Sequence, residues 1–329
     1  MTGGPPTASD SRFLHHPVMV AEVVDHLATI PSGVFLDATV GGGGHARALL
    51  NARPDLALIG LDRDPSAVEA ARAALVDRDA TICQARFGQL ADVLDAQGVS
   101  RLAGSLFDLG VSSAQLDRPN RGFSYRHDGP LDMRMDRAQP TSAHDVVNTW
   151  PTERLAGVLR AFGDERYAHR VAAAIVRARP IVGTAALADV VREAIPAPAR
   201  RRGGHPAKRT FQAIRIAVND ELDQIEPALH AVIDRLVPEG RGVVLSYHSG
   251  EDRIVKQVLR RRAGLDDEAR FRGLPRAAGQ SPPAIELIPR GSRRPRAQEV
   301  ADNPRASSAR FRAFAKRGTQ PDEHDREAA

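Results

Sequence analysis

The chain has few of the residues that form disulfide frameworks, metal cages or membrane segments. Its 329 residues include one cysteine, Cys83, which excludes an intrachain disulfide and a cysteine-based metal site. It has one tryptophan and three tyrosines. No apolar run approaches the roughly 20 residues of a membrane span, and none follows a charged N-terminus. We therefore expect a soluble, cytoplasmic protein without a membrane segment or a bound metal.

The charge of the chain is unevenly distributed. The net charge is +5, but residues 256–317 alone contain sixteen Lys or Arg and six Asp or Glu, so the remainder of the chain is net acidic. A basic segment on a mildly acidic body is typical of proteins that bind a nucleic-acid backbone. An arginine-rich genome would produce a similar excess, so both explanations stay open.

Strands and helices alternate in the first third of the chain, which favours a parallel α/β sheet. The expected strands span 34–38, 56–62, 80–84 and 102–109, and the expected helices 17–27, 46–51, 65–75 and 88–96. After that, apolar stripes predict helices at 152–162, 165–178, 184–195 and 210–237, then a strand at 242–247, a helix at 252–262 and a strand at 284–288.

The pattern therefore predicts a doubly wound, Rossmann-like α/β domain interrupted by a helical insertion. Residues 13–115 and 211–317 form the α/β domain, and residues 116–210 form the insertion. The polar ends, residues 1–12 and 318–329, are expected to be disordered.

Four consecutive glycines, residues 41–44, lie between a strand that ends near Asp37 and a helix that begins near His45. Glycine tolerates positive φ and lets a ligand approach the main chain. Asp62 ends the next strand, where a carboxylate of a doubly wound sheet can hold a ribose. This arrangement predicts a cofactor that contains adenosine, although a glycine-rich surface turn is the simpler alternative.

The charge of Asp37 separates two such cofactors. The glycines are contiguous, whereas the dinucleotide fingerprint spaces them as G-x-G-x-x-G, and a carboxylate would repel a pyrophosphate. S-adenosylmethionine carries an ammonium and a sulfonium and no phosphate. The sequence therefore favours S-adenosylmethionine over NAD.

Two further strand ends carry candidate catalytic residues. Asp108 ends the fourth expected strand beside the glycine turn, where it could accept a hydrogen bond from an amine or only cap a turn. His248 follows the strand at 242–247 and would project toward the same site, although a structural histidine is the commoner case. Ser249 and Asp252 have the spacing of a helix-capping pair, and Asp252 is also a candidate proton acceptor.

Arginines and aromatic residues gather in residues 116–136. Arg121, Phe123, Tyr125 and Arg134 are candidates to clamp and stack an unpaired nucleotide. A loop held together by Arg–carboxylate pairs is the equally weighted alternative.

A second group of cations follows near residue 208. Lys208 and Arg209 at the start of a predicted helix oppose its dipole and call for an anion, and RNA phosphate would serve. Arg215 lies on a face of that helix other than its apolar stripe.

These clusters together resemble one family, the bacterial small-subunit rRNA cytosine-N4 methyltransferases often called MraW. The resemblance runs from about residue 15 to residue 308. Its motifs lie, in order, at residues 37–45, 108–115, 121–124, 128–136, 209–215 and 248–253. Gly250 stands where the family usually has leucine, and Ala114 where it usually has proline.

The resemblance implies a class I methyltransferase domain with a helical insertion, S-adenosylmethionine as the methyl donor, and a decoding-centre cytidine of 16S rRNA in the small ribosomal subunit as the acceptor. The implied donor contacts are Gly43, Gly44, His45, Asp62, Phe87, Asp108 and Gln115, which Asp37 joins on charge grounds. Asp108 or a carbonyl of the following loop would accept a hydrogen of N4, and His248 or Asp252 would receive the proton. A non-catalytic ribosome-assembly binder and a small-molecule or protein methyltransferase are the alternatives. Whether the chain acts as a monomer or a homodimer stays open.

Overall fold

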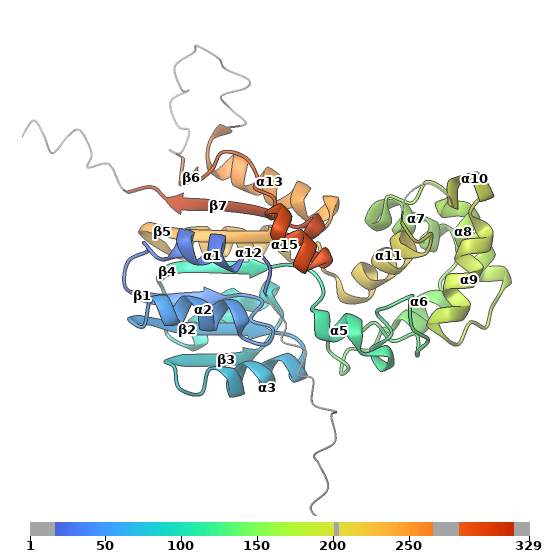
Figure 1. The fold of residues 1–329 in the computed structure, drawn as a ribbon, viewed down its shortest axis with the longest axis horizontal. Helices are drawn as coiled ribbons and strands as arrows, with labels where there is room; N and C mark the ends of the chain where they lie inside the picture. Colours follow the sequence, from blue (N-terminus) through green and yellow to red (C-terminus); the bar gives the residue numbers. More distant parts are fainter. Residues whose placement is uncertain (1–16, 201–203, 266–282, 319–329) are drawn as a thin grey trace, which may run out of the picture.

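The computed structural model describes residues 17–200, 204–265 and 283–318, which form an α/β body and a helical lobe (Figure 1). Within these residues the body contains one seven-stranded sheet with the strand order β3-β2-β1-β4-β5-β7-β6. The strands are β1 (Gly33–Asp37), β2 (Leu56–Asp62), β3 (Ala80–Gln84), β4 (Leu102–Asp108), β5 (Leu236–Ser246), β6 (Ile285–Leu287) and β7 (Arg310–Lys316). Strands β1 to β5 are parallel, whereas β7 runs antiparallel to β5 and to β6.

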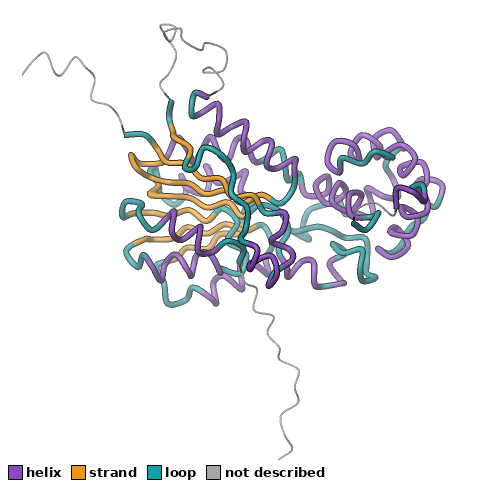
Figure 2. Tube along the Cα trace, turned by 45° about the horizontal axis from the view of Figure 1, so that its top comes forward, coloured by secondary structure: helices purple, strands orange, loops and turns teal. Residues whose placement is uncertain are grey.

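Helices cover both faces of the sheet (Figure 2), because each face of the nearly continuous apolar strands must be buried. One face packs against α1 (Val20–Leu27), α2 (Gly44–Ala52) and α3 (Pro65–Ala74). The other packs against α4 (Leu90–Ala96), which follows the short helix η1 (Phe87–Gln89), and against α12 (Ile225–Arg235) and α13 (Ser249–Arg262). The predicted doubly wound α/β fold is confirmed.

The helical lobe has a hydrophobic core of its own. It follows α5 (Ser113–Asp117) and η2 (Pro119–Arg121), and contains α6 (Ala143–Thr149), α7 (Thr152–Gly163), α8 (Ala168–Arg177), α9 (Thr184–Ala194), α10 (Ala197–Arg200) and α11 (Lys208–Asn219). Its core reaches Val218, so α11 belongs to the insertion and the insertion extends beyond the expected limit at residue 210. Ile216 of the same helix packs in the core of the body, so α11 joins the two parts.

Two expectations about elements are wrong. The single helix expected at 210–237 is two, because α11 ends at Asn219, Asp220 adopts a left-handed conformation with φ of 49°, and α12 begins at Ile225. No element was predicted beyond the strand at 284–288, yet this part of the chain contains α15 (Ala297–Asp302), η3 (Pro304–Ser308) and β7. Among the described residues, no helix is long and apolar enough to cross a membrane. The expected tails, residues 1–12 and most of 318–329, lie outside the described residues.

Candidate active site

Three aspartates lie at the carboxyl ends of three neighbouring strands. Asp37 ends β1, and its register partners are Gly60 of β2 and Leu106 of β4. Asp62 and Asp108 therefore each lie two residues further along their strands than Asp37 does. The predicted convergence of these carboxylates at one edge of the sheet is confirmed, and the helical lobe extends from this same edge (Figure 1).

The glycine turn that joins β1 to α2 needs glycine for two different reasons. Gly43 is the residue before α2 and has φ of 82°, a conformation that residues with a Cβ rarely adopt. A Cβ at Gly44 would overlap the ring of Pro17. The turn therefore places the start of α2 beside the chain ahead of α1 and leaves the main chain at residues 41 and 42 uncovered, since no side chain would meet a Cβ at Gly42.

Asp37 and Asp62 carry an electrostatic cost in this structure. Asp37 is 1% exposed, and burial together with the neighbouring Asp108 and Asp62 raises its pKa to about 8, despite a hydrogen bond from the Thr39 N–H at 3.1 Å. Burial raises the pKa of Asp62 to about 6, although its carboxylate accepts hydrogen bonds from the N–H groups of Asp64 and Gly41, at 2.8 and 3.0 Å. Nearby positive charge on a ligand would relieve this cost.

Phe87 begins the short helix η1, which follows β3, the strand next to the one that Asp62 ends. Its ring packs edge-on against Phe107 of β4, with the ring centroids 6.1 Å apart. The ring is partly buried, and it belongs to the apolar surface beside the helices of the second face. An adenine ring next to the Asp62 carboxylate would find this apolar surface.

Asp108 is held by three groups. The Tyr247 hydroxyl donates to its Oδ1 at 2.7 Å, the Asp108 N–H donates to the Thr39 hydroxyl at 2.6 Å, and Nδ1 of His45 lies 3.6 Å from its Oδ2. His45 is 6% exposed, and its Nε2 contacts the carbonyl of Val18 at 2.9 Å. Tyr247 and His45 thus hold the carboxylate, and Thr39 holds the main chain at Asp108.

Tyr247 is a site residue that the sequence analysis missed. It follows β5, the strand next to β4, so the strand-end reasoning that selected Asp108 also applies to it. Burial and the adjacent Asp108 raise its pKa well above the usual value for tyrosine, which keeps the phenol protonated as a hydrogen-bond donor.

The His248 side chain is engaged at the start of α13. It is the N-cap of α13, where its Nδ1 accepts a weak hydrogen bond from the Glu251 N–H at 3.4 Å and its Nε2 lies 3.0 Å from Glu251 Oε1. The capping pair is thus His248 and Glu251, one residue earlier than the predicted Ser249 and Asp252. The role of His248 as a proton acceptor stays a prediction, and the structure adds a capping role for its ring.

The other predicted proton acceptor, Asp252, is also engaged. Its two carboxylate oxygens accept hydrogen bonds from Arg312 of β7 at 2.7 and 3.1 Å. The role of Asp252 as a proton acceptor therefore stays a prediction, and in this structure its carboxylate is paired with Arg312. Ser249 instead donates to Asp164 of the helical lobe at 2.9 Å.

A buried polar cluster joins the lobe to the end of β2. Asp64 is 3% exposed and accepts hydrogen bonds from Gln115 at 2.9 Å and Arg121 at 2.8 Å. Burial alone would raise the pKa of Asp64, but the contacts with Gln115 and Arg121 act in the opposite direction, and the net effect is a lowered pKa. Gln115, predicted to contact the methyl donor, also accepts from the Ser112 N–H in a capping box, so its amide holds α5 in place.

Most arginines and aromatics predicted to contact RNA are structural. Arg121 is 6% exposed, and Phe123, 5% exposed, packs in the core of the lobe. The side chain of Arg215 is 13% exposed and makes a two-pronged ion pair with Glu221, at 2.9 and 2.8 Å. Arg134 pairs in the same way with Asp132, at 2.7 and 3.2 Å. For Arg121, Phe123 and Arg215 burial corrects the prediction of direct RNA contact.

Three of the predicted RNA-contacting residues remain accessible. Lys208 and Arg209 are exposed in the first turn of α11. Tyr125 is half-buried and stacks on His205, with the ring centroids 4.5 Å apart. They lie on the lobe, on the loop before α6 and at the start of α11.

Both departures from the motifs fit locally. Ala114 is the second residue of α5, a first-turn position at which proline is tolerated, so the helix needs no proline there. A Cβ at Gly250 would lie 3.1 Å from the His248 ring, so this glycine lets the ring pack against the first turn of α13.

Sequence comparisons with known proteins identify one family. A sequence model described as the MraW methylase family matches residues 12–317. A protein named ribosomal RNA small subunit methyltransferase H from Thermobifida fusca is 49% identical, over 98% of this chain and 100% of its own. Its namesake from Acidothermus cellulolyticus is 50% identical, over 96% and 98%. Among solved structures, an rRNA methylase from Streptococcus thermophilus covers 91% of this chain and 97% of its own, with 12% identity and a TM-score of 0.39.

Proposed function

The chain belongs to the MraW methylase family, and from that premise we propose that it methylates the exocyclic N4 of a decoding-centre cytidine in 16S rRNA. Its fold is that of a class I methyltransferase, and it is an S-adenosylmethionine-dependent methyltransferase of ribosomal RNA. The choice of cytidine N4 rests on the sequence resemblance and on the acidic edge around Asp108. We expect the reaction in the cytoplasm.

The observation that carries the proposal is the set of buried carboxylates at the edge of the sheet. Asp37, with its pKa raised to about 8, and Asp62, with its pKa raised to about 6, suit a ligand that brings positive charge. We propose that Asp62 holds the ribose hydroxyls, that Phe87 packs against adenine, and that the uncovered main chain of residues 41–42 meets the polar tail. When bound, S-adenosylmethionine supplies an electrophilic methyl group. The pyrophosphate of NAD is negatively charged and would be repelled by the Asp37 carboxylate, because a pyrophosphate site needs a helix start without acidic residues beside it.

Asp108 is the residue of this chain best placed to act on the acceptor amine. The lone pair of cytosine N4 is delocalised into the ring, so the amine is a poor nucleophile. A carboxylate that accepts one N4 hydrogen draws electron density toward nitrogen and fixes the amine for in-line attack, and such positioning can supply several kcal/mol of rate enhancement. Tyr247 and Thr39 orient Asp108 from two directions, and Tyr247, whose pKa is raised, does not compete as a base.

The acceptor base has to leave its stack to reach this edge, as in other enzymes that act on bases. Lys208 and Arg209 on the lobe, the Tyr125–His205 stack and the basic segment after Lys256 are proposed to hold the RNA around it. Arg134 contributes through the fold of its loop, since its guanidinium is paired with Asp132.

The test uses small ribosomal subunits from a strain that lacks the enzyme, purified protein and S-adenosylmethionine with an isotope-labelled methyl group. Digestion of the 16S rRNA to nucleosides and mass spectrometry then identify the product. We expect label in N4-methylcytidine and at a single position. Label at carbon 5 of cytosine, or on ribose, would refute the choice of N4. Tight binding of subunits without any transfer would favour the non-catalytic assembly binder.

A further inference from the structure

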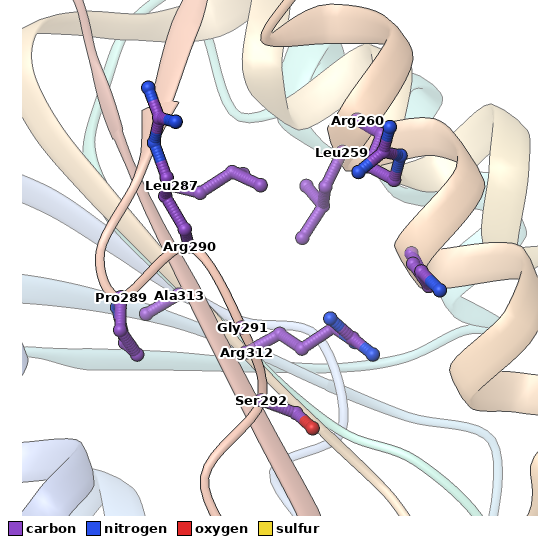
Figure 3. A pocket seen from close by; sticks show the side chains of 10 residues that line it. Leu259, Arg260, Leu287, Pro289, Arg290, Gly291, Ser292, Arg312 and Ala313 are labelled. Atoms are coloured by element: carbon purple, nitrogen blue, oxygen red, sulfur yellow. The ribbon is translucent and has the colours of Figure 1, made fainter. Parts of the chain in front are cut away.

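A small basic groove lies outside the site described above, between α13 and the last two strands (Figure 3). Its cavity volume is about 180 Å³, well below the roughly 300–1,000 Å³ typical of drug-sized ligands. Four cationic side chains line it, Lys256 and Arg260 from α13, Arg290 from the segment after β6, and Arg312 from β7, and no lining residue is acidic. The size and charge suit a small anionic group.

The charges of this groove are only partly neutralised. Arg312, which extends from β7 into the space beside α13 (Figure 3), is paired with Asp252, and Arg260 donates to the carbonyl of Leu265 at 3.3 Å. Across residues 17–200, 204–265 and 283–318, no carboxylate forms an ion pair with Lys256 or Arg290. Both side chains are exposed. Lys256 and Arg290 both line the groove, and cationic side chains without counter-charges are stabilised when an anion binds beside them.

The groove lies close to the carboxyl edge of the sheet. Arg312 is the register partner of Val244, two residues before the end of β5, which corresponds to about 7 Å along a strand. Lys256 is seven residues into α13, which begins at this edge, and that corresponds to about 10 Å along a helix. A nucleic-acid strand whose target base occupies the site can therefore place a neighbouring phosphate in the groove.

The segment that follows Arg290 continues the positive surface toward the edge. Arg293 forms an isolated β-bridge with Phe311 of β7. The residue before Phe311, Arg310, is the register partner of Ser246 at the end of β5. Arg293 and Arg294 are exposed. The positive charge thus forms a track from the groove to the carboxyl edge.

We propose that this groove binds a phosphodiester of the rRNA strand that carries the target nucleotide, with Lys256 and Arg290 as its principal ligands. The inference rests on the proposed function and names a contact of the same RNA. A cavity of about 180 Å³ is too small for a folded protein segment, which favours a phosphodiester over an acidic protein.

The test compares Lys256→Ala/Arg290→Ala with Arg72→Ala/Arg101→Ala, which removes two exposed charges that lie outside residues 256–317. Binding to a protein-free 16S rRNA fragment and to whole small subunits is measured across a series of salt concentrations. For the groove variant we expect about tenfold weaker binding to both probes and a salt slope smaller by roughly 0.7 to 0.9 for each phosphate released. The control variant keeps the wild-type slope, and both variants keep the wild-type affinity for S-adenosylmethionine.

Each remaining outcome separates the two proposals. An unchanged slope for the groove variant, with wild-type protein that still methylates cytidine N4, overturns the groove and leaves the function standing. An effect on whole subunits alone assigns the groove to an acidic ribosomal protein and also overturns it. If inorganic phosphate at millimolar concentration does not compete while the RNA slope still falls, the contact is a phosphodiester of the strand, as proposed.

Discussion

At the scale of single residues, the chemistry of this protein depends on carboxylates that are costly to bury. Asp37 and Asp62 lie at adjacent strand ends, and their raised pKa values show that the folded chain binds protons that the unfolded chain would release. Ligand sites commonly contain titratable groups whose pKa values are perturbed in the free protein because the charge of the ligand is absent. Two predictions belong to this scale.

The first concerns Asp37. Its pKa is about 8 in the folded chain against an ordinary value of 3.8, so the stability contributed by the bound proton is fully present below about pH 4 and is lost as the pH rises through 8. Asp37→Asn removes this loss. Above pH 8 the ligand-free variant should therefore have a free energy of unfolding about 1–2 kcal/mol greater than wild type, which corresponds to a Tm a few degrees higher. Calorimetric Tm values from pH 5 to 9 check this. Parallel Tm curves for the two proteins would contradict it, and the variant should also bind S-adenosylmethionine more weakly.

The second concerns Tyr247, a positioning residue for Asp108. Tyr247→Phe removes the 2.7 Å hydrogen bond and leaves the ring in place. A hydrogen bond to a charged group is worth about 1.5–3 kcal/mol, so kcat should fall about tenfold or more. The affinity for S-adenosylmethionine, measured by calorimetry, should stay within about twofold. Tyr167→Phe in the helical lobe is the matched control. An equal loss in both variants would mean that the Tyr247 hydroxyl has no special role.

At the scale of elements, strand ends and α11 hold the site together. The alternation of strands and helices and the bounds of β2 and β3 follow directly from apolar runs in the sequence. The break at Asp220 does not, because a non-glycine residue with φ of 49° leaves no sequence signal. β7 was not predicted, because only Arg310 to Ala313 alternate cationic and apolar residues, and the apolar run from Ala313 to Ala315 breaks that period.

One prediction at this scale concerns the link between β2 and the lobe. Removing one partner of a buried ion pair leaves the other charge unpaired, which typically costs about 3–5 kcal/mol. Arg121→Ala should therefore destabilise the protein by roughly 3 kcal/mol, because Asp64 is buried beside it. Arg305→Ala, which breaks the exposed pair with Asp117, should cost at most about 1 kcal/mol. Denaturant unfolding of the two variants gives the comparison, and equal losses would be incompatible with a buried link.

At the scale of the whole molecule, the sequence predicted the family, the doubly wound sheet and the three acidic strand ends. It could not separate arginines that bind a partner from arginines that hold the fold. Arg121 and Arg215 stand in sequence surroundings as rich in charge as those of Lys208 and Arg209. In the structure, however, Arg121 is buried against Asp64 and Arg215 against Glu221. Lys208 and Arg209 are exposed. Which carboxylate meets which guanidinium depends on contacts between segments distant in sequence.

The measurement that tests the central claim most directly is a crystal structure of the protein with S-adenosylmethionine bound. We expect the ligand across the carboxyl ends of β2, β1 and β4, with its ribose on Asp62, its charged groups near Asp37 and its methyl group facing Asp108. A ligand lodged elsewhere, with the turn at residues 41–44 uncovered and Asp37 still remote from positive charge, would contradict the role assigned to the acidic edge.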